Sequence, residues 1–502
     1  MAAGVFLLGQ LTLMRAKVCA TVTGRTMTEL RFRRDQIDGA DMVELRLDYV
    51  EDPDVSAALA GRKLPVVVTC RPTWEGGRFK GSEEERRRLL QQALELGAEY
   101  VDLEWRGGFD EVIRRCQGRN VILSLHDFDG IPRDLSDMYR AMCATGANVV
   151  KVAIYANRLS DTLALLELAS GKRQEGRVLL AMGPAGVVSR VLPDRFGSSW
   201  TYAGEGVAPG QISLQEFLVD FRVRSISEET ALYGVVGSPL AHSLSPSMHN
   251  AGFAAMKHDA VYVPLEAADV DDFWTFAAKM RVRGVSVTAP FKEQILSGLS
   301  LLDPLASRVG AVNTVRATSE GWEGINTDVP GFLEPLVERL DLKSTRATVI
   351  GAGGAARAVA VALASEGAQV SVCARNLKRA SEVAELVSGE GALIPPVPDS
   401  WDLLVNTTPV GTFPGLESSP LPGGPFGGDV VYDLVYNPLI TRLMRDAKSA
   451  GCGTIGGLEM LVAQAVRQFK WWTGLEAPID EFREAAKRAV SRGQFYTSGD
   501  DA

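Results

Sequence analysis

The chain has 502 residues, of which 46% are hydrophobic and 23% are charged, so it is long enough for two or more cores and too apolar to be disordered. Its net charge of −9 and the scatter of its lysines and arginines argue against nucleic acid as a partner, since clustered basic residues bind polyanions. Its six cysteines form no CxxC pair, so we expect neither a disulfide framework nor a metal site.

Residues 1–17 contain a short apolar run that no charged residue precedes and that reaches Arg15 too soon to cross a bilayer. We interpret them as an extension of a cytoplasmic protein with no membrane partner. Scattered cysteines suit such a reducing compartment. Met1 and Met14 are both candidate start residues, because the first expected strand follows Met14 closely.

Eight short β-branched or apolar runs recur in the first part of the chain, with helix-like stretches between them. The alternation is typical of an α/β fold with a parallel sheet, and eight repeats are the number that closes a (β/α)8 TIM barrel. The clearest intervening helix, residues 82–97, starts with the capping-box spacing of Ser82 and Glu85 and ends at Gly97. The runs occupy residues 18–24, 42–50, 65–71, 100–105, 121–128, 149–156, 178–184 and 199–204.

Two of these runs end in residues that suggest chemistry. Lys151 lies among valines in VVKVAIY, so a strand would bury it, and a neutral buried amine is a nucleophile for a ketone. His126, in SLHDF on the preceding run, could move a proton near neutral pH. The alternative is a structural lysine paired with a carboxylate inside the barrel.

A polar stretch at residues 222–230 precedes a second α/β region, and residues 347–367 then read as a strand, a glycine turn and an Ala-rich helix. This order predicts a dinucleotide-binding βαβ start, in which amides at the helix start receive a pyrophosphate. The next strand ends in CARNLKR, where Arg375 and Arg379 take the place of an acidic ribose ligand and favour NADP. In the alternative reading these arginines merely begin a solvated helix.

Residues 15–225 resemble a type I 3-dehydroquinate dehydratase, because VELRLD, TCRPTWEGG, SLHDF, VVKVA, VVSR and APGQ occur in order. The resemblance implies a (β/α)8 barrel in which Lys151 forms a Schiff base, His126 moves protons and Glu75 partners the histidine. The chain departs from the family pattern at Val207, where a serine is usual. The resemblance also implies substrate contacts by Glu44, Arg46, Arg71, Arg190 and Gln211.

Residues 231–490 resemble shikimate dehydrogenase, because GSPLAHSLSPSMHN, VTAPFK, GAVNT, NTD, GAGGAAR, NTTPVG, YDLVYNP and MLVAQA occur in order. The resemblance implies that Lys292 and Asp328 form the catalytic pair. It implies that a cyclohexene acid contacts Ser243, Ser245, Thr288, Asn313, Tyr436 and Gln464. It places NADP on Gly351, Ala352, Gly353, Gly354, Ala355, Arg375, Arg379, Thr407 and Gly457.

We expect a barrel over residues 15–225, a substrate-binding domain from 231–335 and 455–490, and a Rossmann NADP-binding domain over 336–454. The two resemblances imply consecutive reactions of the shikimate pathway of aromatic amino acid biosynthesis, because dehydration of 3-dehydroquinate yields the 3-dehydroshikimate that the second enzyme reduces to shikimate. One alternative is a quinate enzyme that prefers NAD, against which Arg375 and Ser245 weigh. The other is a catalytically silent regulator. The oligomeric state stays open.

Overall fold

The computed structural model describes residues 17–171, 176–204, 206–241 and 243–492. The expected N-terminal extension and its two candidate start residues lie outside the described residues. The chain divides into two compact units, the first holding most residues up to 229 and the second residues 230 onward, with residues 156–163 and 183–188 grouped with the second. Among the described helices, none is both long enough and apolar enough to cross a membrane.

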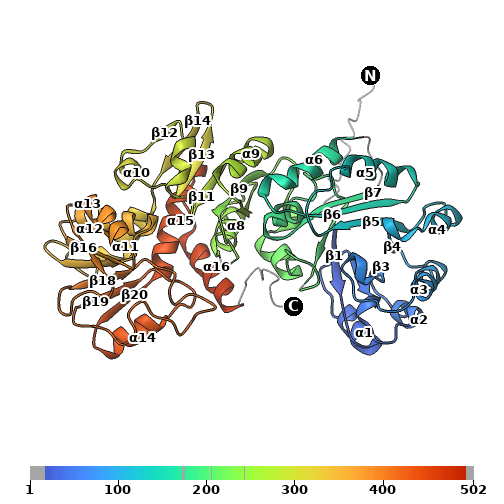
Figure 1. Cartoon of the computed structure of the whole chain (residues 1–502), viewed down its shortest axis with the longest axis horizontal. Helices are drawn as coiled ribbons and strands as arrows, with labels where there is room; N and C mark the ends of the chain where they lie inside the picture. The colour runs from blue at the N-terminus through green and yellow to red at the C-terminus, as the bar shows by residue number, and fades with distance from the viewer. Residues whose placement is uncertain (1–16, 172–175, 205, 242, 493–502) are drawn as a thin grey trace, which may run out of the picture. The chain divides into compact units, whose positions relative to one another are not determined.

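The first unit is built on eight parallel strands, as the eight apolar runs predicted (Figure 1). Neighbouring strands pair in the order β7-β6-β5-β4-β3-β2-β1-β8. Each pair is parallel because a helical connection returns the chain to the same end of the sheet. The strands are β1 (Lys17–Val22), β2 (Met42–Arg46), β3 (Val66–Thr69), β4 (Tyr100–Glu104), β5 (Val121–Asp127), β6 (Val149–Tyr155), β7 (Gly176–Met182) and β8 (Trp200–Ala203).

Strands β7 and β8 stand at the two ends of this order and are joined through a serine. The Ser198 hydroxyl accepts the Leu179 N–H at 2.8 Å and donates to the Leu179 carbonyl at 3.0 Å. The Ser199 N–H donates to the Arg177 carbonyl at 2.8 Å. These contacts satisfy polar groups that an open sheet edge would expose, and they close the barrel.

Short helices connect the barrel strands. The helix α3 starts with the predicted capping box, in which Ser82 and Glu85 each accept the other's backbone N–H, and Gly97 follows it with φ +76°. The barrel interior is apolar around Cys19, Val67 and Val178 and polar toward the carboxyl ends of the strands. The helices are α1 (Met27–Asp35), α2 (Val55–Leu59), α3 (Glu83–Glu95), α4 (Asp110–Arg115), α5 (Leu135–Ala144), α6 (Leu163–Ser170) and α7 (Val187–Val191).

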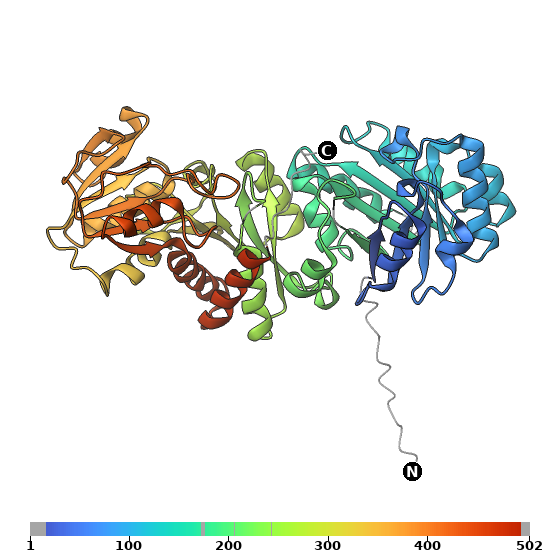
Figure 2. The same cartoon turned by 90° about the horizontal axis from the view of Figure 1, so that it is seen from below.

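The second unit contains two six-stranded sheets. The first has the order β10-β9-β11-β13-β14-β12, with β13 antiparallel to both of its neighbours. Helices α15 and α16, red in Figures 1 and 2, pack with α8 around Phe253, Phe469 and Phe482. The strands are β9 (Ala231–Gly237), β10 (Ala260–Glu266), β11 (Gly284–Val287), β12 (Leu301–Leu302), β13 (Thr314–Thr318) and β14 (Gly321–Ile325). The helices are α8 (Ser245–Ala255), α9 (Val270–Met280), α10 (Pro304–Val309), α11 (Asp328–Val337), α15 (Gly457–Thr473) and α16 (Ile479–Ser491).

The second sheet of this unit is entirely parallel and has the order β17-β16-β15-β18-β19-β20. This is the strand order 3-2-1-4-5-6 of a Rossmann fold, in which ligands bind where the order reverses between the first and fourth strands. The reversal lies between β15 and β18. The strands are β15 (Arg346–Ile350), β16 (Gln369–Ala374), β17 (Glu390–Leu393), β18 (Leu403–Asn406), β19 (Val430–Asp433) and β20 (Gly453–Gly456), with helices α12 (Gly354–Ser365), α13 (Leu377–Glu385) and α14 (Arg442–Ser449).

Candidate active sites

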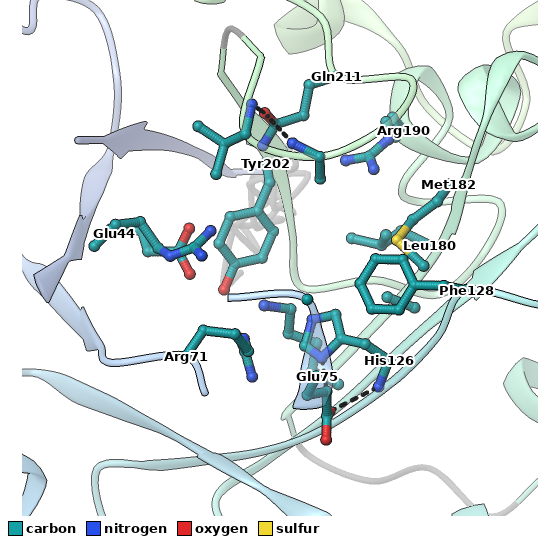
Figure 3. Close-up of a pocket in the computed structure, with 16 residues that line it drawn as sticks. Glu44, Arg71, Glu75, His126, Phe128, Leu180, Met182, Arg190, Tyr202 and Gln211 are labelled. Carbon is teal, nitrogen blue, oxygen red and sulfur yellow. Dashed lines mark hydrogen bonds and ion pairs between the residues drawn. The ribbon is translucent and has the colours of Figure 1, made fainter. Parts of the chain in front are cut away.

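A pocket opens at the carboxyl ends of the barrel strands, the face at which (β/α)8 barrels hold their functional residues (Figure 3). All eight residues that the sequence assigned to the dehydratase chemistry and its substrate line it together. They are Glu44, Arg46, Arg71, Glu75, His126, Lys151, Arg190 and Gln211.

Lys151 on β6 is 5% exposed, and its Nζ donates to Asp102 Oδ2 at 3.0 Å. Burial alone would raise the pKa of Asp102, but Arg71 and Lys151 outweigh burial and hold this pKa below its usual range. Asp102 is therefore ionised and lies beside the Lys151 nitrogen. The alternative interpretation, a lysine paired with a carboxylate inside the barrel, is therefore correct about the contact, but Lys151 also lines the pocket.

His126 lies at the end of β5, the strand beside β6. Glu75 Oε1 lies 3.0 Å from His126 Nδ1 and also accepts the backbone N–H of His126 at 3.0 Å. Burial, with the charges of Arg71 and Lys151, lowers the pKa of His126 well below its usual value, so the imidazole is neutral at pH 7. A neutral imidazole whose Nδ1 faces a carboxylate presents its other nitrogen as a base.

Burial raises the pKa of Glu75 to about 7, against the opposing charge of Arg71. Its second oxygen, Oε2, is buried and has no hydrogen-bond partner among the described residues. Glu75 therefore changes its charge near neutral pH while it contacts the histidine.

Arg71 and Glu44 hold the opposite wall. Arg71 Nη1 donates to Glu104 Oε1 at 3.0 Å and to the Ser124 hydroxyl at 2.9 Å. The two Glu44 oxygens accept the hydroxyls of Thr21 and Thr69, from strands on either side of β2, at 2.9 and 2.8 Å. Both side chains are thereby fixed before a substrate arrives.

Arg46 is fixed in the same way, by the residue two positions further along the chain. Its guanidinium makes a two-pronged contact with Asp48, with Nε and Nη2 donating at 2.9 and 2.8 Å. A planar guanidinium held on one edge in this manner presents its remaining N–H groups in a set direction.

Arg190 on α7 is 2% exposed, and burial lowers the pKa of its guanidinium to about 10. Its Nε is buried without a hydrogen-bond partner, and among the described residues no carboxylate pairs with the Arg190 guanidinium. Gln211 Oε1 accepts the backbone N–H groups of Val207 and Ala208 at 3.0 and 3.1 Å, which leaves its amide N–H groups free to donate. Val207 replaces the usual serine side chain but keeps this backbone contact.

Asp102, Glu104 and Tyr202 are among the pocket or supporting residues that the sequence reading missed. Asp102 and Glu104 alternate along β4 and point into the barrel, where they bind Lys151, Arg71 and Arg86. Two carboxylates at alternate positions of an otherwise apolar strand were a visible signal, because buried charges require partners. Tyr202 lies in the apolar run at residues 199–204, and nothing in that run indicated a functional tyrosine.

The second unit brings Lys292 and Asp328 together. Lys292 Nζ lies 2.6 Å from Asp328 Oδ2, and Asp328 Oδ1 accepts the Asn313 side-chain amide at 2.7 Å. The Asn313 carbonyl oxygen of the side chain accepts the Thr327 N–H at 2.8 Å. This chain of contacts fixes the lysine at the start of α11.

The predicted serines and Thr288 lie at the same edge of the first sheet of this unit. The serine loop follows β9 and leads into α8 at Ser245, while Thr288 follows β11, the parallel neighbour of β9. The Val287 N–H donates to the Asn313 carbonyl at 2.7 Å, which brings Asn313 to the end of β11 as well. The carboxyl ends of parallel strands thus gather the hydroxyl, amide and lysine groups.

The dinucleotide turn lies beside this group. A side chain at Gly354 would meet Lys292 at 3.0 Å, and one at Gly351, with φ +120°, would meet the Thr407 hydroxyl at 2.3 Å. Nothing lies within 4 Å of a side chain at Gly353, where α12 starts. The turn is therefore closed behind by Thr407, lies beside Lys292, and is open in front, which fits a bound pyrophosphate.

The remaining predicted residues are less closely joined to the group. Arg375 and Arg379 are exposed after β16, and neither forms an ion pair within the described ranges. The Gln464 amide donates to the carbonyl of Leu461 in its own helix, and Tyr436 packs half-buried beside the core around Phe253. A Gly457 side chain would meet the Leu434 carbonyl at 2.2 Å. Ala352 and Ala355 are partly exposed in the turn.

Four protein-family models match the chain in order. Residues 18–227 match type I 3-dehydroquinase. Residues 235–315 match the shikimate dehydrogenase substrate binding domain, residues 335–406 match shikimate / quinate 5-dehydrogenase, and residues 457–487 match the shikimate 5'-dehydrogenase C-terminal domain.

Two curated relatives cover the second half of the chain. Both are named shikimate dehydrogenase (NADP(+)). The protein from Moorella thermoacetica is 42% identical over 281 residues, which are 53% of this chain and 95% of that protein. The protein from Natronomonas pharaonis is 42% identical over 267 residues, which are 52% of this chain and 99% of that protein.

A third relative spans both halves. It is the chloroplastic bifunctional 3-dehydroquinate dehydratase/shikimate dehydrogenase of Arabidopsis thaliana, 34% identical over 499 residues. The match covers 92% of this chain and 82% of the relative. With the barrel pocket and the lysine beside the dinucleotide turn in the same order, the chain belongs to the family of bifunctional 3-dehydroquinate dehydratase/shikimate dehydrogenases.

Proposed function

We propose that the chain dehydrates 3-dehydroquinate to 3-dehydroshikimate at Lys151 and His126 and reduces 3-dehydroshikimate to shikimate with NADPH beside Lys292 and Asp328. The observation that carries the proposal is the barrel pocket, where a buried lysine shares a cavity with a histidine whose pKa is lowered. The proposed domains are residues 15–225 for the barrel, 231–335 with 455–490 for substrate binding, and 336–454 for NADP.

In the first reaction, Lys151 Nζ attacks the ketone carbon and water leaves with one proton taken up from solvent, so that a protonated imine forms. His126 then removes a proton from the neighbouring carbon, and the electrons of that bond pass toward the imine nitrogen. Return of these electrons expels the hydroxyl group, which leaves as water with the proton that His126 gives back. Hydrolysis of the imine frees the product and Lys151. Asp102 stays ionised throughout and offsets the positive imine.

Substrate recognition follows from the fixed groups of the pocket. Arg190, buried without a carboxylate among the described residues, would pair with the substrate carboxylate, and the free N–H groups of Gln211 would share it. Glu44, Arg46 and Arg71, each held by neighbouring side chains, would bind the substrate hydroxyls. A site built from such groups rejects analogues that lack the matching oxygen.

In the second reaction, bound NADPH supplies a hydride to the carbonyl carbon. The Gly351–Gly354 turn would hold its pyrophosphate, and Arg375 with Arg379 would hold its 2′-phosphate. Thr407 and Gly457 would shape the pocket around it. Lys292 would donate a proton to the oxygen of the reduced carbonyl, and Asp328 would hold the lysine in place at 2.6 Å.

The remaining substrate contacts of this half are proposed for Ser243, Ser245, Thr288, Asn313, Tyr436 and Gln464. The partners are small molecules rather than nucleic acid or membrane. We place the reaction in a reducing, cytoplasmic compartment, because all six cysteines, in a structure that describes each of them, are unpaired thiols.

A coupled assay tests the proposal. With 3-dehydroquinate and NADPH supplied together, absorbance of the reduced nicotinamide falls only if both reactions proceed in sequence. Loss of absorbance with NADPH but little with NADH would agree with the proposal. A flat trace with tight binding of 3-dehydroquinate would identify a silent regulator instead, and faster turnover of quinate with NAD would identify a quinate enzyme.

A further inference from the structure

Tyr202 is a pocket residue that the two-residue mechanism leaves without a role. It lies on β8, is 3% exposed, and lines the same cavity as Lys151 and His126. Lys151 Nζ lies over the face of its ring, 4.5 Å from the ring centre. Figure 3 shows the hydroxyl end of the ring turned into the pocket, toward the space between Arg71 and His126.

The hydroxyl of Tyr202 is buried and has no hydrogen-bond partner among the described residues. The neighbouring polar group on its own strand, the Trp200 indole N–H, is a donor and leaves the Tyr202 O–H hydrogen without an acceptor. Buried polar groups without partners cost folding free energy and are uncommon in native proteins. An acceptor supplied by a bound molecule would satisfy this one.

The hydroxyl keeps its proton. Burial raises the pKa of Tyr202 well above its usual value, and Cys19, Glu44 and Asp102 act in the same direction, while Trp200 opposes them. Tyr202 is therefore a hydrogen-bond donor at neutral pH rather than a base or a nucleophile.

Resting on the proposed function, we propose that Tyr202 is a further catalytic residue of the dehydratase, whose hydroxyl donates a hydrogen bond to the substrate oxygen on the carbon that Lys151 attacks. As the N–C bond forms, the C=O π electrons move onto that oxygen, which takes up a proton that the amine loses. The oxygen then takes up a second proton, from bulk solvent, and leaves as water when the C=N bond forms, so the imine carries the positive charge. A donor held at this oxygen stabilises its developing negative charge in both steps and itself gives up no proton.

The ring and the hydroxyl would serve successive stages. The ring face attracts a cation, so it favours the protonated imine that replaces the lysine. The hydroxyl stabilises the substrate oxygen, which leaves before the protonated imine forms. Removal of the hydroxyl alone separates the two effects, because phenylalanine keeps the ring.

The test compares Tyr202→Phe with Tyr139→Phe. Tyr139, on α5, also carries a buried hydroxyl without a hydrogen-bond partner among the described residues, but it lies outside the pocket. Rapid mixing of the full-length enzyme with 3-dehydroquinate, followed by borohydride at timed intervals, measures how fast Lys151 gains the mass of the reduced imine. We expect Tyr202→Phe to slow this step roughly 10- to 100-fold, and Tyr139→Phe to leave it within about twofold.

Thermal unfolding supplies a second measurement. Both variants should unfold at the wild-type temperature or above it, since each loses an unsatisfied buried hydroxyl. A midpoint that falls only in Tyr202→Phe would assign the hydroxyl to structure and overturn the inference. Wild-type trapping rates in Tyr202→Phe, with or without a raised KM for 3-dehydroquinate, would also overturn it. Absence of any tag on Lys151 in the wild-type chain would instead overturn the proposed function.

Discussion

The barrel site and the dehydrogenase site both depend on a lysine beside an aspartate, yet they are built differently. The Lys151 side chain is 6% exposed, on a strand, above a network of buried charges that includes Asp102 and Arg71. The Lys292 side chain is 18% exposed, on a loop beside a glycine turn, with Asp328 at a helix start. The first lysine lies within a closed set of partners and the second at an open edge.

The difference follows from what each reaction must bring to the site. In the proposed barrel reaction Lys151 is the covalent partner, so the amine, its counterion and the proposed proton carrier are assembled in advance. In the proposed dehydrogenase reaction the hydride comes with NADPH, so the edge beside Lys292 would have to stay open for the nicotinamide. Burial therefore marks the site whose chemistry is complete in the chain, and exposure marks the site that a cofactor completes.

The sharpest way to separate the two sites is to remove each lysine in turn. Lys151→Ala should reduce dehydratase turnover by about 10⁴-fold or more, because the covalent partner is lost, while dehydrogenase turnover stays within about twofold. Lys292→Ala should do the reverse, with a loss of roughly 10²- to 10⁴-fold in reduction of 3-dehydroshikimate. Separate steady-state assays of the two reactions measure both variants, and equal loss of both activities in either variant would show that the sites are one cooperative unit.

His126→Ala tests whether imine formation and proton transfer in the barrel site are separate steps. The variant should still form the imine on Lys151, because the amine and its counterion remain, but kcat should fall about 10²- to 10⁴-fold with the proton carrier gone. Borohydride trapping and steady-state kinetics on the same preparation distinguish the two steps. If trapping disappears together with turnover, His126 also assists imine formation or merely supports the lysine.

The sequence predicted the barrel fold more completely than the contacts between the residues inside the barrel. Eight runs with helices between them have few other arrangements, and the end of each parallel strand is at one face, so Lys151 and His126 could be paired in advance. The supports of these residues could not. Asp102 was visible as an acid in an apolar strand, but which of several inward-pointing cations it would meet depends on side-chain directions across three strands.

Contacts between distant segments also limit what the sequence predicts about the second site. The glycine turn and CARNLKR are local in the sequence, and local geometry suffices to predict a phosphate site. That Gly354 lies against Lys292 depends on how two sheets far apart in the sequence pack, and no residue pattern encodes it. Gln464 illustrates the converse, because its amide, expected at the substrate, donates to the Leu461 carbonyl of its own helix.

The proposed NADP site of the dehydrogenase can be tested at Arg375. Arg375→Ala should raise KM for NADPH roughly 10- to 150-fold, since a charged hydrogen bond to phosphate contributes about 1.5 to 3 kcal/mol, and should leave KM for 3-dehydroshikimate nearly unchanged. KM for NADH should barely respond, and Arg379→Ala should give a smaller effect of the same kind. Lys378→Ala is the matched control, an exposed cation at the same helix start. Equal weakening of NADH and NADPH would mean that CARNLKR only begins a solvated helix.

The smallest expected effect concerns the pH dependence of the barrel site. The pKa of Glu75 is raised to about 7, whereas that of His126 is held well below its usual value, so near pH 7 only Glu75 changes charge within the pair. Ionised Glu75 stabilises the imidazolium that forms when His126 takes a proton, so dehydratase kcat should rise as pH increases through about 7. Glu75→Gln cannot ionise, so it should abolish this rise, with kcat roughly 10-fold below wild type at pH 8 and much closer at pH 6.

Glu99→Gln, which removes a partly exposed carboxylate paired with Arg62, should keep the wild-type profile. A rise through pH 7 that survives in Glu75→Gln would assign it to another group and leave Glu75 a purely structural contact of the histidine.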